Sequence, residues 1–138
     1  MDYVITEYKD YNEQEILPLY ESVGWINYIK KPQLLKEAYL HSLKIYAAYA
    51  EGKLVGIIRV VGDGCSVVFV QDLLVYPAYH RQGIGTALLK RIMEEYRSVY
   101  QLHLLTENTE RTIAFYKSLG FMMDTDIECR AFSKYCVD

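Results

Sequence analysis

Two glycines stand close together in the segment HRQGIGT, residues 80–86, immediately before a long helical pattern. Gly83 and Gly85 lack the Cβ atom that would keep a ligand away from the backbone. The N–H groups at a helix start have no partners inside the helix, and the helix dipole places partial positive charge there. With the charge of Arg81 and the hydroxyl of Thr86 nearby, the loop predicts a pyrophosphate cradle. The alternative is a tight turn whose glycines serve close packing between a strand and a helix.

The loop matches neither of two common phosphate-binding fingerprints. A dinucleotide-binding loop has a small residue three positions after its second glycine, whereas this chain has Leu88 there. A Walker loop ends in Gly-Lys-Ser/Thr, which this segment lacks. The sequence therefore favours a pyrophosphate cradle of another kind.

The elements that must position this loop follow from hydrophobic periodicity and from turn residues. Strands are predicted where β-branched and aromatic residues cluster, and helices where apolar residues recur every three or four positions. The predicted strands are Tyr3–Tyr8, Ile45–Ala50, Lys53–Val61, Val67–Val75, Leu102–Thr106, a segment from Phe121 onward, and Arg130–Tyr135. The predicted helices are Glu13–Val23, Pro32–Leu43, Gly85–Arg97 and Glu110–Leu119.

This order of elements, β-α-α-β-β-β-α-β-α-β-β, indicates a single α+β domain over residues 1–138. We expect a mixed, mainly antiparallel sheet flanked by helices on both faces. Asn12 suits the cap of the first helix, and Gly62-Asp63-Gly64 suits a hairpin turn. Pro18 lies inside the first helical pattern and predicts a kink or a split there.

The composition bears on partners and location. The net charge of −3 argues against nucleic acid as the main partner, because phosphate binding favours a basic face. The three cysteines are far apart and form no Cys-x-x-Cys pair, so we expect no metal site and a reducing, cytoplasmic setting. The chain opens without a signal-peptide pattern, and no apolar run approaches the ~18 residues of a membrane helix. We therefore expect no membrane partner.

Two further motifs stand at residues 72–89 (DLLVYPAYHRQGIGTALL) and at residues 113–121 (IAFYKSLGF). They resemble motif A and the motif B helix of the GNAT superfamily, the Gcn5-related N-acetyltransferases. The spacing between the motifs and the run of strands before them also match. The resemblance is strong over residues 45–123 and covers the whole chain in element order. It implies the GNAT fold, an N-acetyltransferase activity and acetyl-CoA as cosubstrate.

The resemblance also implies which residues bind acetyl-CoA. The backbone of Leu73, Leu74 and Val75 would hydrogen-bond the pantetheine arm, as an added strand does. The pyrophosphate would be held by the backbone amides of Arg81, Gln82, Gly83, Ile84, Gly85 and Thr86. His80 stands where the family usually has Gln or Arg. Thr109 stands where the family commonly has a cofactor-contacting Asn, and the neighbouring Asn108 is the candidate to replace it.

The resemblance places a general acid at Tyr116, which would protonate the departing CoA thiolate; packing beside Phe115 is the alternative. Amine acetylation also needs a neutral amine and a donor for the developing oxyanion, which an N–H near Leu74 would supply. Asp72 is the candidate base, because a carboxylate in a partly buried cleft can have a raised pKa. A structural hydrogen bond by Asp72 is an equal alternative. Glu107 or a chain of waters could also accept the proton.

Acceptor recognition is expected outside the two motifs. Trp25 and Tyr28 lie between the first two predicted helices, a segment that lines the acceptor site in the family, and their bulk favours a closed pocket. The alternative for Trp25 is a lid on the hydrophobic core. The expected reaction is direct transfer of an acetyl group from acetyl-CoA to a primary amine of a small molecule, in a ternary complex. The alternatives are acetylation of a protein or peptide and a non-catalytic acyl-CoA sensor. A homodimer that pairs through an edge strand at Ala131–Tyr135 is a further option.

Overall fold

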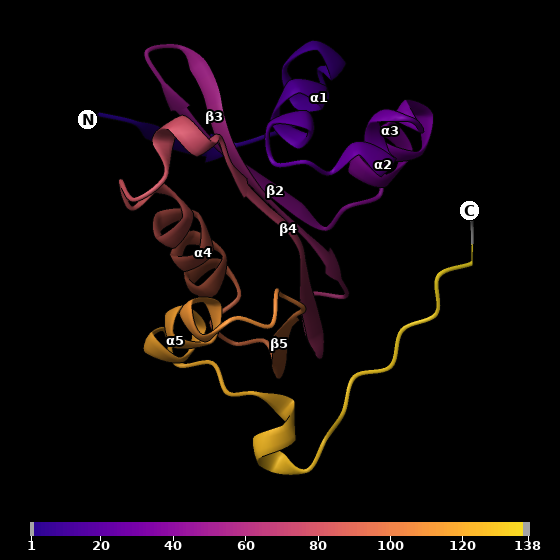
Figure 1. Cartoon of the computed structure of the whole chain (residues 1–138), viewed down its shortest axis with the longest axis vertical. Coiled ribbons are helices and arrows are strands. Elements are labelled where there is room, and N and C mark those ends of the chain that lie inside the picture. The colour runs from indigo at the N-terminus through magenta and orange to yellow at the C-terminus, as the bar shows by residue number, and fades with distance from the viewer. Residues whose placement is uncertain (1, 137–138) are drawn as a thin grey trace. The chain divides into compact units, whose positions relative to one another are not determined.

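A five-stranded sheet forms the framework of the first part of the chain (Figure 1). The computed structural model describes residues 2–136, and the chain divides into two compact units, Met1–Leu105 and Thr106–Asp138. The strands of the first unit are β1 (Val4–Glu7), β2 (Lys44–Ala50), β3 (Lys53–Gly62), β4 (Val67–Val75) and β5 (Gln101–Leu104). They lie in this order, and neighbours are antiparallel except for the parallel pair β4 and β5. The predicted mixed, mainly antiparallel sheet is confirmed.

Helices cover both faces of this sheet, as predicted. On one side lie α1 (Glu13–Ser22), α2 (Ile26–Ile29) and α3 (Pro32–Leu40), and on the other lies α4 (Ile84–Glu95) (Figure 1). Side chains of α1 and α3 share one buried cluster with Ala47 of β2 and Ile57 of β3. Tyr46 points to the opposite face of β2, where it donates a hydrogen bond to Glu95 and packs under the Arg91 guanidinium of α4.

Local sequence signals predict only some of the ends of the first helices correctly. The Asn12 side chain accepts a hydrogen bond from the Gln14 N–H at 3.0 Å and so caps α1, as predicted. Pro18 lies inside α1, but the helix is not split there. Pro32 occupies the first turn of α3, which ends at Leu40, three residues before its predicted end. The short helix α2 escapes prediction because four residues are too few to show a helical period.

The second unit holds the helix α5, Glu110–Ser118, close to its predicted span, and the short 3-10 helix η2, Asp124–Ile127. The predicted closing strands, from Phe121 onward and at Arg130–Tyr135, are wrong, because no residue described after Leu104 lies in a strand. Phe132 and Tyr135 are instead 93% and 89% exposed. Such residues form a strand only where a neighbouring strand supplies hydrogen bonds and packing. The pairing edge expected at Ala131–Tyr135 is therefore not a strand.

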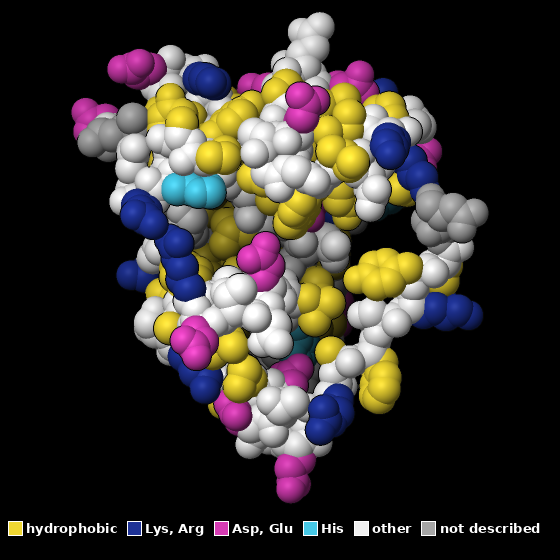
Figure 2. Space-filling model, in the orientation of Figure 1, with side chains coloured by type: hydrophobic (Ala, Val, Ile, Leu, Met, Phe, Trp, Pro, Cys, Tyr) yellow, Lys and Arg dark blue, Asp and Glu magenta, His cyan; other side chains and the backbone are white. Residues whose placement is uncertain are grey.

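Charged side chains of both signs are scattered over the face seen in Figure 2. Within residues 2–136, no helix is long and apolar enough to cross a membrane. The expectations about nucleic acid, membranes and a single domain stay predictions.

Candidate active site

The second half of β4 has a strand neighbour on one side only, as far as the described residues show. β5 pairs with the first four residues of β4, whereas β3 pairs with β4 as far as Val75. The Tyr76 N–H donates to the Val55 carbonyl of β3 at 2.9 Å. Backbone groups alternate in direction along a strand. The N–H and C=O groups of Leu74 therefore also point toward β3, and those of Leu73 and Val75 point toward the open edge. Two of the three residues predicted to hold a pantetheine arm therefore present hydrogen-bonding groups to an added strand.

The glycine loop joins this open edge to α4. After the 3-10 turn η1 (Pro77–Tyr79), Arg81 and Gly83 adopt left-handed φ angles of 65° and 80°. The first bond of α4 runs from the Ala87 N–H to the Gly83 carbonyl at 2.9 Å, and no described side chain caps the helix. The N–H groups of residues 84–86 consequently have no acceptor within the helix. A left-handed residue before helical ones turns successive N–H groups toward one side, the arrangement that binds anions.

The two glycines of the loop differ in whether the protein's own structure requires a glycine. Gly83 needs its positive φ, which side chains of L-residues disfavour. A Cβ placed on Gly85 would meet only the Val75 Cγ2 atom, at 3.9 Å, an ordinary van der Waals distance. Packing within the protein therefore does not require a glycine at position 85. The open space beside Gly85 fits a cradle in which a ligand approaches the backbone.

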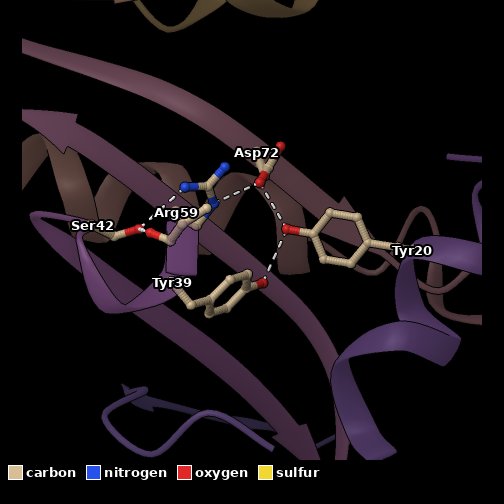
Figure 3. A network of polar contacts seen from close by, with 6 residues as sticks. Tyr20, Tyr39, Ser42, Arg59 and Asp72 are labelled. Carbon is tan, nitrogen blue, oxygen red and sulfur yellow. Dashed lines mark hydrogen bonds and ion pairs between the residues drawn. The ribbon is translucent and has the colours of Figure 1, made fainter. Parts of the chain in front are cut away.

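Asp72 belongs to a buried polar network on the α1 and α3 side of the sheet (Figure 3). Asp72 is 1% exposed, and its Oδ2 atom accepts hydrogen bonds from the Arg59 Nε and the Tyr20 hydroxyl, both at 2.7 Å. Since Tyr20 gives its only proton to Asp72, the Tyr39 hydroxyl at 3.0 Å must donate to Tyr20. Arg59 also donates to the Ser42 hydroxyl at 3.2 Å. The network thus ties both helices to β3 and β4.

Burial and charge set the protonation of this network. Burial raises the pKa of the Tyr20 and Tyr39 hydroxyls, so both stay protonated at neutral pH. Burial by itself lowers the pKa of Arg59, but the Asp72 carboxylate outweighs it and the pKa rises. The Asp72 Oδ1 atom is buried and has no hydrogen-bond partner among the described residues. These contacts supply the structural role for Asp72 that the sequence left open beside catalysis.

Sequence reasoning missed Arg59 and Tyr20 as partners of Asp72. Arg59 is a charged residue within the apolar run of β3, and such a residue is rarely buried unless it is paired. That signal indicates a partner without naming it. The β3–β4 register, which sets Arg59 opposite Asp72, identifies the partner.

The predicted acceptor residues pack against this network. The Tyr20 ring lies 6.2 Å from the Trp25 ring and 5.4 Å from the Tyr28 ring, edge to face in both cases. Trp25 is 41% exposed, and Tyr28 is half-buried. The three rings form an aromatic cluster that extends from the buried Asp72 to the surface.

The other two predicted site residues lie in the second unit. Tyr116 is part of α5, where its ring packs against Phe115 at 4.9 Å and Phe121 at 5.8 Å. Burial raises the pKa of Tyr116, and a hydrogen bond with Thr106 partly opposes this. Asn108 is exposed just before Thr109, whose hydroxyl caps α5 by accepting from the Thr112 N–H at 3.1 Å. Thr109 thus serves the helix end, and Asn108 keeps an accessible amide.

A sequence profile described as an acetyltransferase (GNAT) domain matches residues 41–123, more than half of the chain. The uncharacterized N-acetyltransferase ycf52 of Pyropia yezoensis is 28% identical over 128 residues, which cover 91% of this chain and 73% of that protein. The chloroplastic serotonin N-acetyltransferase 2 of Oryza sativa subsp. japonica is 29% identical over 101 residues, covering 70% of this chain and 50% of that protein.

Solved structures give the same answer for the fold. A GNAT-family acetyltransferase from Streptococcus pneumoniae TIGR4 superposes with a TM-score of 0.89 at 39% identity, covering 99% of this chain and 100% of that one. An aminoglycoside acetyltransferase from a soil metagenome superposes with a TM-score of 0.75 at 21% identity, covering 99% of this chain and 100% of that one. At 21% identity the likeness concerns the fold alone.

Proposed function

The chain belongs to the GNAT family of acetyltransferases, and from this premise we propose that it transfers the acetyl group of acetyl-CoA directly to a primary amine of a small molecule. One observation carries the proposal. The open edge of β4 ends at Val75, and an uncapped helix start follows at Ile84, less than ten residues later. An extended amide-containing arm and an anionic pyrophosphate need these two features next to each other.

The residues present fit acetyl-CoA. The backbone of Leu73 and Val75 offers hydrogen-bonding groups to the pantetheine arm, and the loop amides from Arg81 to Thr86 offer donors to the pyrophosphate. Asn108 is proposed as a further cofactor contact. When bound, acetyl-CoA supplies an activated thioester, and the protein contributes mainly by holding it and the amine in attack geometry.

Tyr116 is proposed as the group that delivers a proton to the leaving thiolate. A phenol is protonated at neutral pH, and the pKa of Tyr116 lies above the ordinary value of 10.0, so its hydroxyl has a proton to donate to the thiolate. Asp72 is assigned to holding β4 in place, because a base must come within hydrogen-bond reach of the amine. Asp72 is 1% exposed and already pairs with Arg59. Glu107 or water would then accept the proton of the amine.

The proposed acceptor class is a small amine with an aromatic or aliphatic body. Trp25 and Tyr28 would form one wall, since aromatic rings bury such groups at low entropic cost. The rice relative is named for serotonin, an aromatic amine, which supports placing such amines in the test panel.

The proposed function is tested by incubating the protein with acetyl-CoA and a panel of aromatic, aliphatic and polycationic amines and lysine peptides. Thiol release and the mass of the product are measured together. Acetylated small amines with matching thiol release are expected. Acetylated peptides alone would select a protein acceptor, and acetyl-CoA binding without thiol release would select a sensor.

A further inference from the structure

His80 makes a contact that the proposed reaction does not use. Its Nε2 atom lies 2.8 Å from the carbonyl oxygen of Val75, five residues earlier. Since a carbonyl only accepts, Nε2 must carry the proton, and the imidazole donates. The bond spans the 3-10 turn η1 and closes the connection between the end of β4 and the start of the glycine loop.

This contact lies where the two halves of the proposed cofactor site meet. The Val75 carbonyl is one of the groups that strand alternation turns toward the open edge of β4. The residue after His80 is Arg81, whose left-handed φ of 65° is unfavourable for a residue with a side chain. A left-handed residue that is not glycine persists when its surroundings hold it, and the His80 bond is anchored directly beside it.

The contact that Tyr3 makes with the loop is weaker. The Tyr3 hydroxyl lies 3.5 Å from the Gly83 carbonyl, at the limit of a hydrogen bond. Among the described residues, His80 therefore makes a shorter side-chain contact with the chain outside residues 80–83 than Tyr3 does.

We propose that His80 is a positioning residue for acetyl-CoA: it fastens the glycine loop to the end of β4, so that the pyrophosphate donors are held ready in the free protein. Its bond also occupies the Val75 carbonyl, which leaves the Leu73 backbone and the Val75 N–H as the open-edge groups for the pantetheine arm. This inference rests on the proposed function. It goes beyond that function by giving a role to a side chain that the acetyl transfer itself does not require.

Two variants and two ligands test it. His80→Leu removes the donor, and His80→Gln keeps an N–H that can reach a carbonyl. The ligands are CoA and 3′-phosphoadenosine 5′-diphosphate, which retains the phosphates and lacks pantetheine. Titration calorimetry should show His80→Leu weakening both ligands by a similar factor of about three to ten. His80→Gln should restore most of the loss, and the melting temperature should change little, because a single exposed hydrogen bond contributes little to global stability.

Each other result overturns the proposal. Tighter CoA binding by His80→Leu would mean that the imidazole competes with the pantetheine arm. A loss for CoA alone would assign His80 to pantetheine, and no change would leave it without a role. A wild-type protein that binds neither ligand would refute the proposed function itself, which is a separate outcome.

A direct contact between His80 and the phosphates must be distinguished from positioning. Nitrogen-15 spectra of the imidazole report which ring nitrogen carries the proton. We expect Nε2 to carry a proton and to donate to Val75 both in the free protein and in the CoA complex. A change in the Nε2 signal on CoA binding that marks loss of the hydrogen bond to Val75 would show that His80 leaves Val75 for a phosphate, and would overturn the inference.

Discussion

At the scale of single residues, side chains of similar chemistry have different roles. Tyr116 and Tyr20 are both phenols whose pKa burial raises. Tyr20 is committed to Asp72 by a 2.7 Å hydrogen bond, whereas the Tyr116 ring packs between Phe115 and Phe121. The first arrangement suits a structural donor, and the second suits a hydroxyl kept protonated for chemistry.

Replacing Tyr116 with Phe removes the proposed acid and keeps the ring. The variant should lower kcat by about a hundredfold, a usual effect for a general acid. The KM for acetyl-CoA should change little, because the packing with Phe115 remains. Steady-state kinetics with thiol detection measures both, and Tyr135→Phe, at an 89% exposed position, is the matched control. Equal losses in kcat and acetyl-CoA affinity would instead assign Tyr116 to cofactor packing.

The Arg59–Asp72 pair separates a structural role of Asp72 from a catalytic one. Arg59→Met should cost about 3–5 kcal/mol in the free energy of unfolding, because it leaves a buried carboxylate unpaired. The double variant Arg59→Met, Asp72→Leu should recover much of that loss, which urea unfolding measures. It should also keep kcat within about fivefold of wild type, since general-base catalysis would contribute 10²-fold or more. If the double variant is stable but inactive, Asp72 would have to be the general base.

The buried tyrosines predict how stability responds to alkaline pH. The pKa of Tyr20 and Tyr39 is raised above the ordinary value of 10.0, so the folded state keeps protons that the unfolded chain releases. Their contribution is complete below pH 10 and is lost as pH rises above it. Urea unfolding between pH 9 and 11 should show a steeper fall for wild type than for Tyr20→Phe. Parallel slopes for the two proteins would contradict this.

At the scale of elements, the part of the site nearest the glycine motif is the part that sequence predicted best. The strand Val67–Val75 has its predicted bounds, and α4 starts within one residue of its predicted start. Proline and glycine determine local backbone geometry without help from distant residues, which is why these ends are readable. The sequence does not show that the backbone groups of Leu73 and Val75, and not those of Leu74, face the open edge, because this depends on the pairing of β4 with β3.

Gly85→Ala tests the helix start as a ligand cradle. The added Cβ would meet the Val75 Cγ2 atom at 3.9 Å, so the melting temperature should change little. Acetyl-CoA affinity should fall about tenfold or more, because the methyl group occupies the space where the pyrophosphate approaches. Calorimetry and thermal unfolding measure the two effects separately. Gly83→Ala is the comparison: it should also lose stability, since its φ is 80°. Unchanged affinity in Gly85→Ala would remove the pyrophosphate from this position.

At the scale of the whole molecule, the sequence predicts features that depend on local residue patterns. It does not predict features that depend on contacts between residues far apart in the chain. The fold class is confirmed, and so is the element order through α5 apart from the short helix α2, which was not predicted. The prediction of two closing strands is wrong, because residues that favour strands form one only beside a neighbouring strand, and no strand is described after Leu104. The Arg59–Asp72–Tyr20 network was missed for a related reason, since its members come from β3, β4 and α1.

The central claim is that acetyl-CoA lies along the open edge of β4 with its pyrophosphate on the start of α4. The most direct test follows the backbone amide signals of the labelled protein by NMR during titration with acetyl-CoA. The largest shifts are expected at Leu73, Val75 and residues 81–86, with a smaller shift at Leu74, whose N–H faces β3. Saturable shifts that leave these amides unmoved and fall elsewhere, or no shifts at all, would contradict the account.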